Sequence, residues 1–142
     1  MDYDKENQQW IEYIKLSNGQ SAVISFLLYP RGKTLYYFVT FGIANKKKVL
    51  REWLEEKGSG DLETKCTGNC GTEGLIWAYH KVEEFIKEHS KSGDKKILKH
   101  KIAVCGADKR RHRIYRYFLK RLGFIEEFDQ QFGWIITKIL DI

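Results

Sequence analysis

The sequence has one proline, three cysteines and no apolar run that approaches the ~18 residues of a membrane span. Residues 1–6 lack the apolar stretch of a signal peptide, and no segment is of low complexity. These absences exclude a membrane-spanning, a secreted and a low-complexity protein. A chain of 142 residues, 42% of them hydrophobic, buries enough surface to fold without a disulfide or a structural metal. We therefore predict a single cytoplasmic domain that spans residues 1–142.

The cysteines are too few and too far apart to form a disulfide framework. Cys66, Cys70 and Cys105 cannot all pair within one chain, and a cytosolic compartment keeps thiols reduced. The spacing of Cys66 and Cys70 would suit half of a zinc site, but no second Cys or His pair follows at finger spacing. The sequence therefore predicts no metal site, and the cysteines are interpreted as small buried hydrophobic residues.

Positive charge is concentrated in one segment of the chain. Residues 91–121 hold twelve basic side chains against two acidic ones, a net charge of +10, whereas the whole chain carries only +6. Such asymmetry favours a partner of negative charge, which would be a phosphorylated cofactor, a nucleic acid or an acidic protein. The alternative is a helix whose charged face is simply solvated.

The periodicity of the hydrophobic residues predicts alternating strands and helices. Alternating or continuous apolar runs, rich in β-branched and aromatic residues, predict strands over residues 10–16, 21–29, 34–43, 61–67, 100–106, 124–128 and 134–140. Apolar residues at three- and four-residue spacing predict helices over residues 45–57, 72–89 and 108–122, the last ended by Gly123. The fold class is therefore α+β (mixed α/β), with a central, mostly antiparallel sheet of about seven strands and three helices.

A glycine-rich segment lies between a predicted strand and a predicted helix. Gly68, Gly71 and Gly74 precede or begin the helix, where free backbone N–H groups and the positive helix end suit a pyrophosphate. The spacing matches neither the P-loop nor the dinucleotide-binding motif. The alternative is a turn in which Thr72 caps the helix.

Residues 61–140 resemble the GNAT superfamily of acyl-CoA N-acyltransferases. The strand Ile102-Ala103-Val104, a helix that ends in Arg121-Leu122-Gly123-Phe124 and two final antiparallel strands are similar to the C-terminal half of that superfamily. Residues 71–76, Gly-Thr-Glu-Gly-Leu-Ile, resemble its pyrophosphate loop, which precedes an amphipathic helix. The resemblance implies a GNAT-like fold and transfer of an acetyl group from acetyl-CoA to an amine, by direct attack within a ternary complex.

The same resemblance assigns cofactor-binding residues. It places Gly71 at the first loop glycine, with the backbone amides of Thr72 and Gly74 near the pyrophosphate of coenzyme A. Basic residues of the charged segment, Lys109 and Arg113 among them, are expected to meet the 3′-phosphate of the cofactor. The acceptor amine and the oligomeric state are not indicated by the sequence.

A catalytic proton donor is expected on the third predicted helix. The superfamily places its thiolate-protonating tyrosine where this chain has Leu119, and Tyr115 lies one turn earlier on the same helix face. The resemblance therefore points to Tyr115 as the catalytic residue. The alternative interpretation of Tyr115 is an aromatic residue of the core.

Two functions of other classes compete with the acyltransferase. The first is a nucleic-acid-binding module that uses the basic segment 91–121, with an exposed Tyr117 stacked on a base. The second is a non-catalytic GNAT-like interaction protein that uses the aromatic strand of residues 35–41 as a contact surface.

Overall fold

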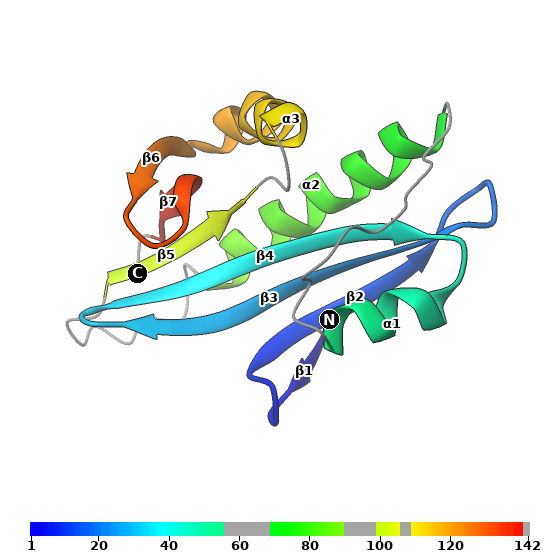
Figure 1. Ribbon diagram of the computed structural model, residues 1–142, viewed down its shortest axis with the longest axis horizontal. Helices are drawn as coiled ribbons and strands as arrows, with labels where there is room; N and C mark the ends of the chain where they lie inside the picture. Colours follow the sequence, from blue (N-terminus) through cyan, green and yellow to red (C-terminus); the bar gives the residue numbers. More distant parts are fainter. Residues whose placement is uncertain (56–68, 90–98, 106–108, 141–142) are drawn as a thin grey trace. The chain divides into compact units, whose positions relative to one another are not determined.

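The fold is described from a computed structural model over residues 1–55, 69–89, 99–105 and 109–140. Strands and helices alternate along the chain much as the hydrophobic periodicity predicts (Figure 1). In chain order the elements are β1 (Asp2–Asp4), β2 (Gln9–Lys15), β3 (Ser21–Arg31), β4 (Thr34–Ala44), α1 (Lys47–Glu55), α2 (Asn69–His89), β5 (Lys99–Val104), α3 (Lys109–Leu119), the 3₁₀ turn η1 (Lys120–Leu122), β6 (Ile125–Asp129) and β7 (Gly133–Ile139).

The strands form one mixed sheet in the order β1-β2-β3-β4-β5-β7-β6. β4 and β5 pair in parallel, joined by a connection that contains α2, whereas β5 with β7 and β6 with β7 pair antiparallel. A parallel pair needs such a crossover, because its two strands run in the same direction. The predicted mixed α+β fold, with seven strands and three helices, is confirmed.

Several predicted boundaries differ from the structure, which also contains one strand that the sequence did not predict. The sequence did not predict β1, which pairs antiparallel with β2 in the register Tyr3 to Trp10. The strand predicted over residues 61–67 lies outside the described residues. β3 continues to Arg31 through Pro30, which is tolerated because this strand end is exposed and needs no further ladder bond. None of the helices in the described segments has the length and apolarity required to cross a bilayer.

The chain divides into two compact units. The first contains Met1–Phe26 and Thr40–Lys81, and the second contains Leu27–Val39 and Val82–Ile142. The division cuts β3, β4 and α2, so that each unit holds part of each of these elements. The two units are described separately below.

In the first unit, α1 covers the strand residues whose side chains share its side of the sheet. Leu50 and Leu54 recur at helical spacing and are buried, with exposed fractions of 0% and 9%. They pack with Val23 and Ala44, and Ile11, Tyr13 and Trp53 complete the cluster. A second cluster joins Leu16, Ala22 and Ile43 to Phe41 and to Trp77 of α2. Together the two clusters form the apolar core of this unit.

In the second unit, the parallel pair of strands supports apolar residues on both sides. Tyr36, Ala103 and Ile135 are buried together, and Tyr29 and Phe38 pack against them. Phe85 of α2 is fully buried, and its ring contacts the rings of Tyr37 and His89.

The apolar side of α3 is only partly buried. Leu119 is buried as expected, but Ile114 is 36% exposed. Gly123 adopts a left-handed conformation at φ 88° and caps the end of η1, as the sequence predicted.

An ion pair joins the β3–β4 turn to the β6–β7 turn in the second unit. The Arg31 guanidinium donates two hydrogen bonds to the Asp129 carboxylate, one of them at 3.1 Å from Nη1 to Oδ1. Arg31 also lies over the rings of Tyr36 and Phe132, with its Cζ atom 4.9 Å and 5.6 Å from the two centroids. The bidentate geometry fixes the orientation of both turns.

The Arg31–Asp129 pair predicts a dependence of stability on acid. Chiefly because it accepts hydrogen bonds from Arg31, the Asp129 carboxyl has a pKa held well below its usual value of 3.8. The stability it contributes is therefore complete above that usual value and is lost as the pH falls below it. We expect Asp129→Asn to be less stable than the wild type at about pH 7, with the difference shrinking toward about pH 2.

Urea unfolding midpoints over this pH range measure the effect. Asp2→Asn, which removes an exposed carboxylate, is the matched control. An Asp129→Asn difference that stays constant across the range would contradict the assignment.

Candidate functional site

The first turns of α2 lie against the last residues of β4 in the first unit. A Cβ atom built on Gly74 would lie 2.7 Å from Cδ1 of Ile43 and 3.5 Å from the ring of Phe41. Ile43 is only 4% exposed, so it has little room to yield to a larger side chain. Glycine at position 74 therefore allows the helix to approach the end of β4 closely.

The first amides of α2 have no partner within the described helix. The helix begins at Asn69, three residues before the predicted start at 72, so these amides are those of residues 69–71. Gly71 and Thr72 belong to this first turn. The Gly74 amide lies one turn deeper, where helix geometry pairs it with the carbonyl four residues earlier. Its role near the pyrophosphate stays a prediction, and its observed contact is the packing on Ile43.

Glu73 is held by the turn that joins β2 to β3. Its Oε1 atom accepts a hydrogen bond of 3.0 Å from the Ser17 backbone N–H, and its Oε2 atom accepts one from the Ser17 hydroxyl. These bonds lower the pKa of the Glu73 carboxyl, the hydroxyl having the larger effect. Glu73 therefore stays ionised, with its charge engaged by Ser17 rather than left open at the helix start.

β4 runs past the end of its partner strand. The register of β4 with β5 ends at Val39 with Val104, whereas β4 continues to Ala44. Among the described strands, none pairs with residues 40–44 on the side away from β3. Within the described residues, alternate N–H and C=O groups along these five residues therefore have no strand partner on that side.

The other residues expected from the sequence lie on α3 in the second unit. Lys109 and Arg113 are exposed, and Tyr115 is half-buried on the same side of the helix as Leu119, which is buried. Each helix thus brings together its own part of the predicted site, with Gly71, Thr72 and Gly74 on α2, and Lys109, Arg113 and Tyr115 on α3.

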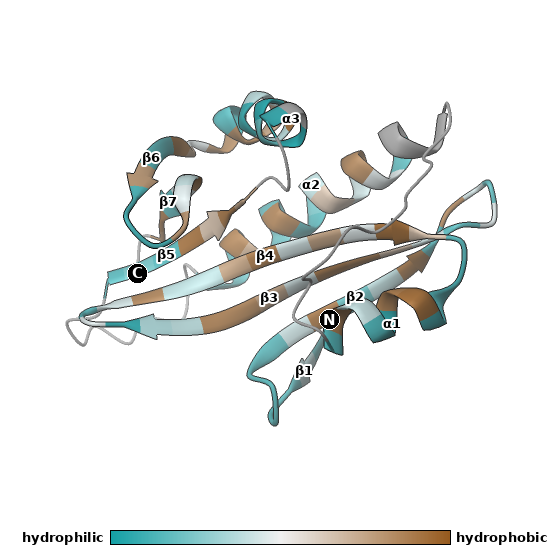
Figure 2. Ribbon diagram, viewed as in Figure 1, coloured by the Kyte–Doolittle hydropathy of each residue, from teal (hydrophilic) through white to brown (hydrophobic). Residues whose placement is uncertain are grey.

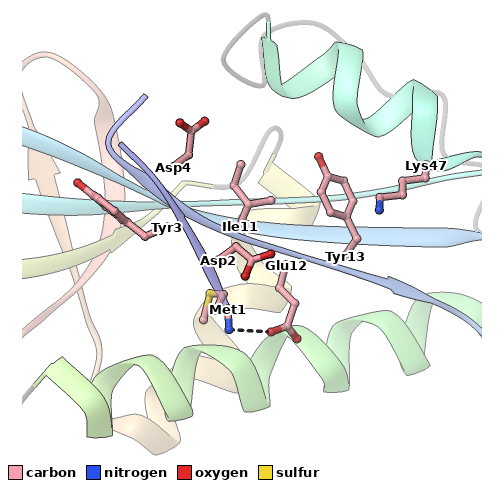
Figure 3. Close-up of a pocket in the computed structure, with 8 residues that line it drawn as sticks. All are labelled: Met1, Asp2, Tyr3, Asp4, Ile11, Glu12, Tyr13 and Lys47. Carbon is pink, nitrogen blue, oxygen red and sulfur yellow. Dashed lines mark ion pairs between the residues drawn. The ribbon is translucent and has the colours of Figure 1, made fainter. Parts of the chain in front are cut away.

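An open depression lies beside β1 and β2 in the first unit, and several of its side chains already have partners. It measures about 510 Å³, and Figure 3 shows its lining side chains: Met1, Asp2, Tyr3, Asp4, Ile11, Glu12, Tyr13 and Lys47. The Glu12 carboxylate lies 3.6 Å from the Met1 ammonium and 2.6 Å from Nζ of Lys81. Nζ of Lys47 lies 4.7 Å above the Tyr13 ring. With its charges engaged in this way, the depression is a weaker site than the start of α2.

Metal-ligating residues do not gather in the part of the chain that the structure describes. Within it, no three His, Cys, Asp or Glu side chains lie close enough together to hold a metal ion. The side chains of Cys66 and Cys70, the pair considered for zinc, lie outside the described residues. Cys105, directly after β5, is a free thiol with an exposed side chain, so its interpretation as a buried hydrophobic residue is wrong. Partial desolvation raises the pKa of its thiol.

Comparison with family models, curated proteins and solved structures finds no match to this chain. The function is therefore inferred from the residues and geometry of this chain alone.

Two features that bear on function were not predicted from the sequence. One is the extension of β4 beyond β5, although the predicted strand over 34–43 is visibly longer than the one over 100–106. The other is an exposed aromatic pair, Phe128 and Trp134, on the β6–β7 hairpin. Their equal distance from the centre of the connecting loop would have indicated that they face each other across the hairpin.

Proposed function

We propose that the chain is an acyl-CoA-dependent N-acyltransferase that transfers an acetyl group from acetyl-CoA to an amine. One observation carries the proposal. The start of α2 packs through Gly74 against the end of β4 that extends beyond β5, within one unit of the structure. This arrangement offers an anion-binding helix end and an open strand edge side by side.

The start of α2 suits the pyrophosphate of coenzyme A, and the edge of β4 suits its pantetheine arm. A pyrophosphate accepts hydrogen bonds from backbone amides at a helix start, where the helix dipole also favours negative charge. The pantetheine arm carries amide groups, and amides add to an open strand edge as an extended peptide does. The engagement of Glu73 by Ser17 reduces the repulsion that a free carboxylate would exert on the phosphates.

The order of elements after α2 also supports the proposal. The resemblance expects a strand, a helix ending at Gly-Phe and two antiparallel strands. The chain has β5, then α3 with η1 ending at Gly123-Phe124, and then the antiparallel pair β6 and β7. Fold order alone does not define an activity, so the site at the start of α2 remains the main argument.

The reaction requires little covalent chemistry from the protein. Acetyl-CoA supplies a thioester carbonyl, which a neutral amine attacks so that a C–N bond forms and the C–S bond breaks. The chain must hold the thioester and the amine in contact, and a proton must reach the departing sulfur. The resemblance assigns the proton to the Tyr115 hydroxyl and the 3′-phosphate contacts to Lys109 and Arg113.

Isothermal titration of acetyl-CoA into the protein tests the proposal. We expect micromolar binding in the wild type and at least a tenfold loss in Gly71→Glu, because the added carboxylate repels phosphate at the helix start. Ile76→Glu adds the same charge to α2 at a position that is 46% exposed, and it should bind as the wild type does. Absence of binding by the wild type, or equal binding by Gly71→Glu, would refute the proposal.

A comparison of coenzyme A with its 3′-dephospho form separates the contributions of α2 and α3 to cofactor binding. If Lys109 and Arg113 hold the 3′-phosphate, the wild type should prefer coenzyme A to its 3′-dephospho form. The double variant Lys109→Gln/Arg113→Gln should lose that preference while Gly71→Glu weakens both ligands equally. A preference that survives the double substitution would remove these two residues from the site.

A further inference from the structure

Two large aromatic side chains lie exposed on the β6–β7 hairpin in the second unit. Phe128 is 62% exposed and Trp134 is 58% exposed, and they are register partners across the hairpin. Their ring centroids are 5.5 Å apart at an interplanar angle of 67°. Because an edge-to-face pair of this kind leaves ring faces exposed, these faces are available to contact a ligand.

The aromatic pair shares a sheet face with α3. Side chains alternate across a strand, so Phe128 lies on the same face of β6 as Glu126. Glu126 in turn contacts α3, with its Oε2 atom 2.6 Å from Nε2 of His112 and its Oε1 atom 3.5 Å from Nη1 of Arg116. The rings of Phe128 and Trp134 therefore lie one step along the strands from the side of α3 that carries His112 and Arg116.

That side of α3 is basic along its whole length. Lys109 precedes His112 at helical spacing, Arg113 and Arg116 continue along the same side, and Lys120 extends the series at the start of η1; all four cations are exposed. Hydrophilic colouring dominates the helix in Figure 2. Glu126 is the acidic group at the border of this stripe, where it forms a hydrogen bond with His112 and an ion pair with Arg116. The surface thus combines a cationic stripe with open aromatic faces.

We propose that this surface, formed by the basic stripe of α3 and the Phe128–Trp134 pair, binds single-stranded nucleic acid. Lysine and arginine neutralise backbone phosphates, and exposed rings stack on unpaired bases. Tyr117 of α3, which is 65% exposed beside Arg121, adds a third accessible ring. This proposal of nucleic-acid binding does not depend on the acyltransferase proposal.

The ring geometry favours single strands over a duplex or a membrane. A duplex hides its base faces within the stack, so exposed rings would gain nothing from it beyond the phosphate contacts. An anionic bilayer would be expected to meet a broad aliphatic surface, whereas the apolar part here is two paired rings beside charged groups. Stacking on bases uses both the rings and the cations.

Fluorescence anisotropy with a labelled oligodeoxythymidylate, about twelve nucleotides long, tests the proposal. We expect saturable binding that weakens steeply with added salt, and weaker binding of the corresponding duplex. Trp134→Ala should lower the affinity about tenfold, because one stacking contact is lost, and Trp134→Phe should restore most of it. Ile139→Ala, on the opposite face of β7 and 47% exposed, is the matched control and should bind normally.

The basic stripe is tested with residues that the acyltransferase proposal does not use. Arg116→Gln/Lys120→Gln should reduce the slope of log affinity against log salt by about 1.4, as expected for two lost phosphate contacts on a single strand. Lys46→Gln/Lys48→Gln removes two exposed cations elsewhere and should leave the slope unchanged.

Circular dichroism and thermal unfolding of each variant confirm that it is folded before binding is compared. Four outcomes would overturn the proposal: no oligonucleotide binding by the wild type, duplex binding as tight as single-strand binding, wild-type affinity in folded Trp134→Ala, or sedimentation with anionic vesicles in place of oligonucleotide binding.

Discussion

Replacing Phe85 with alanine is expected to lower the free energy of unfolding by about 3–5 kcal/mol. Phe85 is fully buried in the second unit, where its ring lies 3.8 Å from the His89 ring and 5.4 Å from the Tyr37 ring, measured between centroids. The substitution removes these contacts and leaves a cavity that rigid neighbours fill only in part. Denaturant unfolding followed by circular dichroism measures the loss.

A titration distinguishes the predicted cavity from a general loss of structure. Burial is the main reason that the pKa of His89 lies below its usual value of 6.5. Opening the site to water should raise this pKa toward that value, which NMR of the imidazole protons measures. Tyr117→Ala removes an aromatic ring that is 65% exposed, and it should change stability by no more than about 0.5 kcal/mol. A Phe85→Ala protein as stable as Tyr117→Ala would contradict the assignment of Phe85 to the core.

Replacing Leu50 with alanine is expected to cost about 2–5 kcal/mol in the first unit. Leu50 is fully buried among Val23, Ala44 and Leu54, and it is the residue through which α1 covers these strands. A helix of nine residues is too short to be stable in isolation, so its stability depends on this packing. Hydrogen exchange of the α1 amides, measured beside chemical unfolding, should show that their protection falls.

The neighbouring position supplies the control for Leu50. Val49 lies next to it on α1 but is 44% exposed, so Val49→Ala removes apolar atoms that gain little from folding. We expect Val49→Ala to leave the protection of α1 nearly unchanged. Equal losses in the two variants would show that α1 is not fixed through the buried side of the helix.

Periodicity predicted most of the fold because the apolar residues that it counts are the ones that become buried. The run around Ile24 and Phe26 and the stripe of α2 around Val82 are examples, since these side chains are at most 4% exposed. β1 was not predicted because its three residues, Asp-Tyr-Asp, are largely exposed and carry no hydrophobic signal. Its strand conformation comes from pairing with β2, which is a tertiary effect.

The candidate site was predictable only in part, for a different physical reason. A glycine in the sequence indicates either a close approach of the backbone or a special backbone conformation, but the sequence alone does not distinguish the two. Gly71 was assigned to the helix start, where it lies, whereas Gly74 serves close packing on Ile43. The end of β4 has no partner in β5 because β4 is the longer strand. The two strands are distant in the sequence, so no sequence motif indicates this difference in length.

The bond between Glu73 and Ser17 also constrains the order in which the chain folds. The β2–β3 hairpin closes locally, through the Leu16 N–H bond to the Gln20 carbonyl and the Gly19 N–H bond to the Leu16 carbonyl. Glu73 follows Ser17 by 56 positions, so the loop entropy of that separation must be overcome before the two meet. The first turns of α2 therefore gain their tertiary contacts after the hairpin exists, and the phosphate-binding end of the proposed site is a late product of folding.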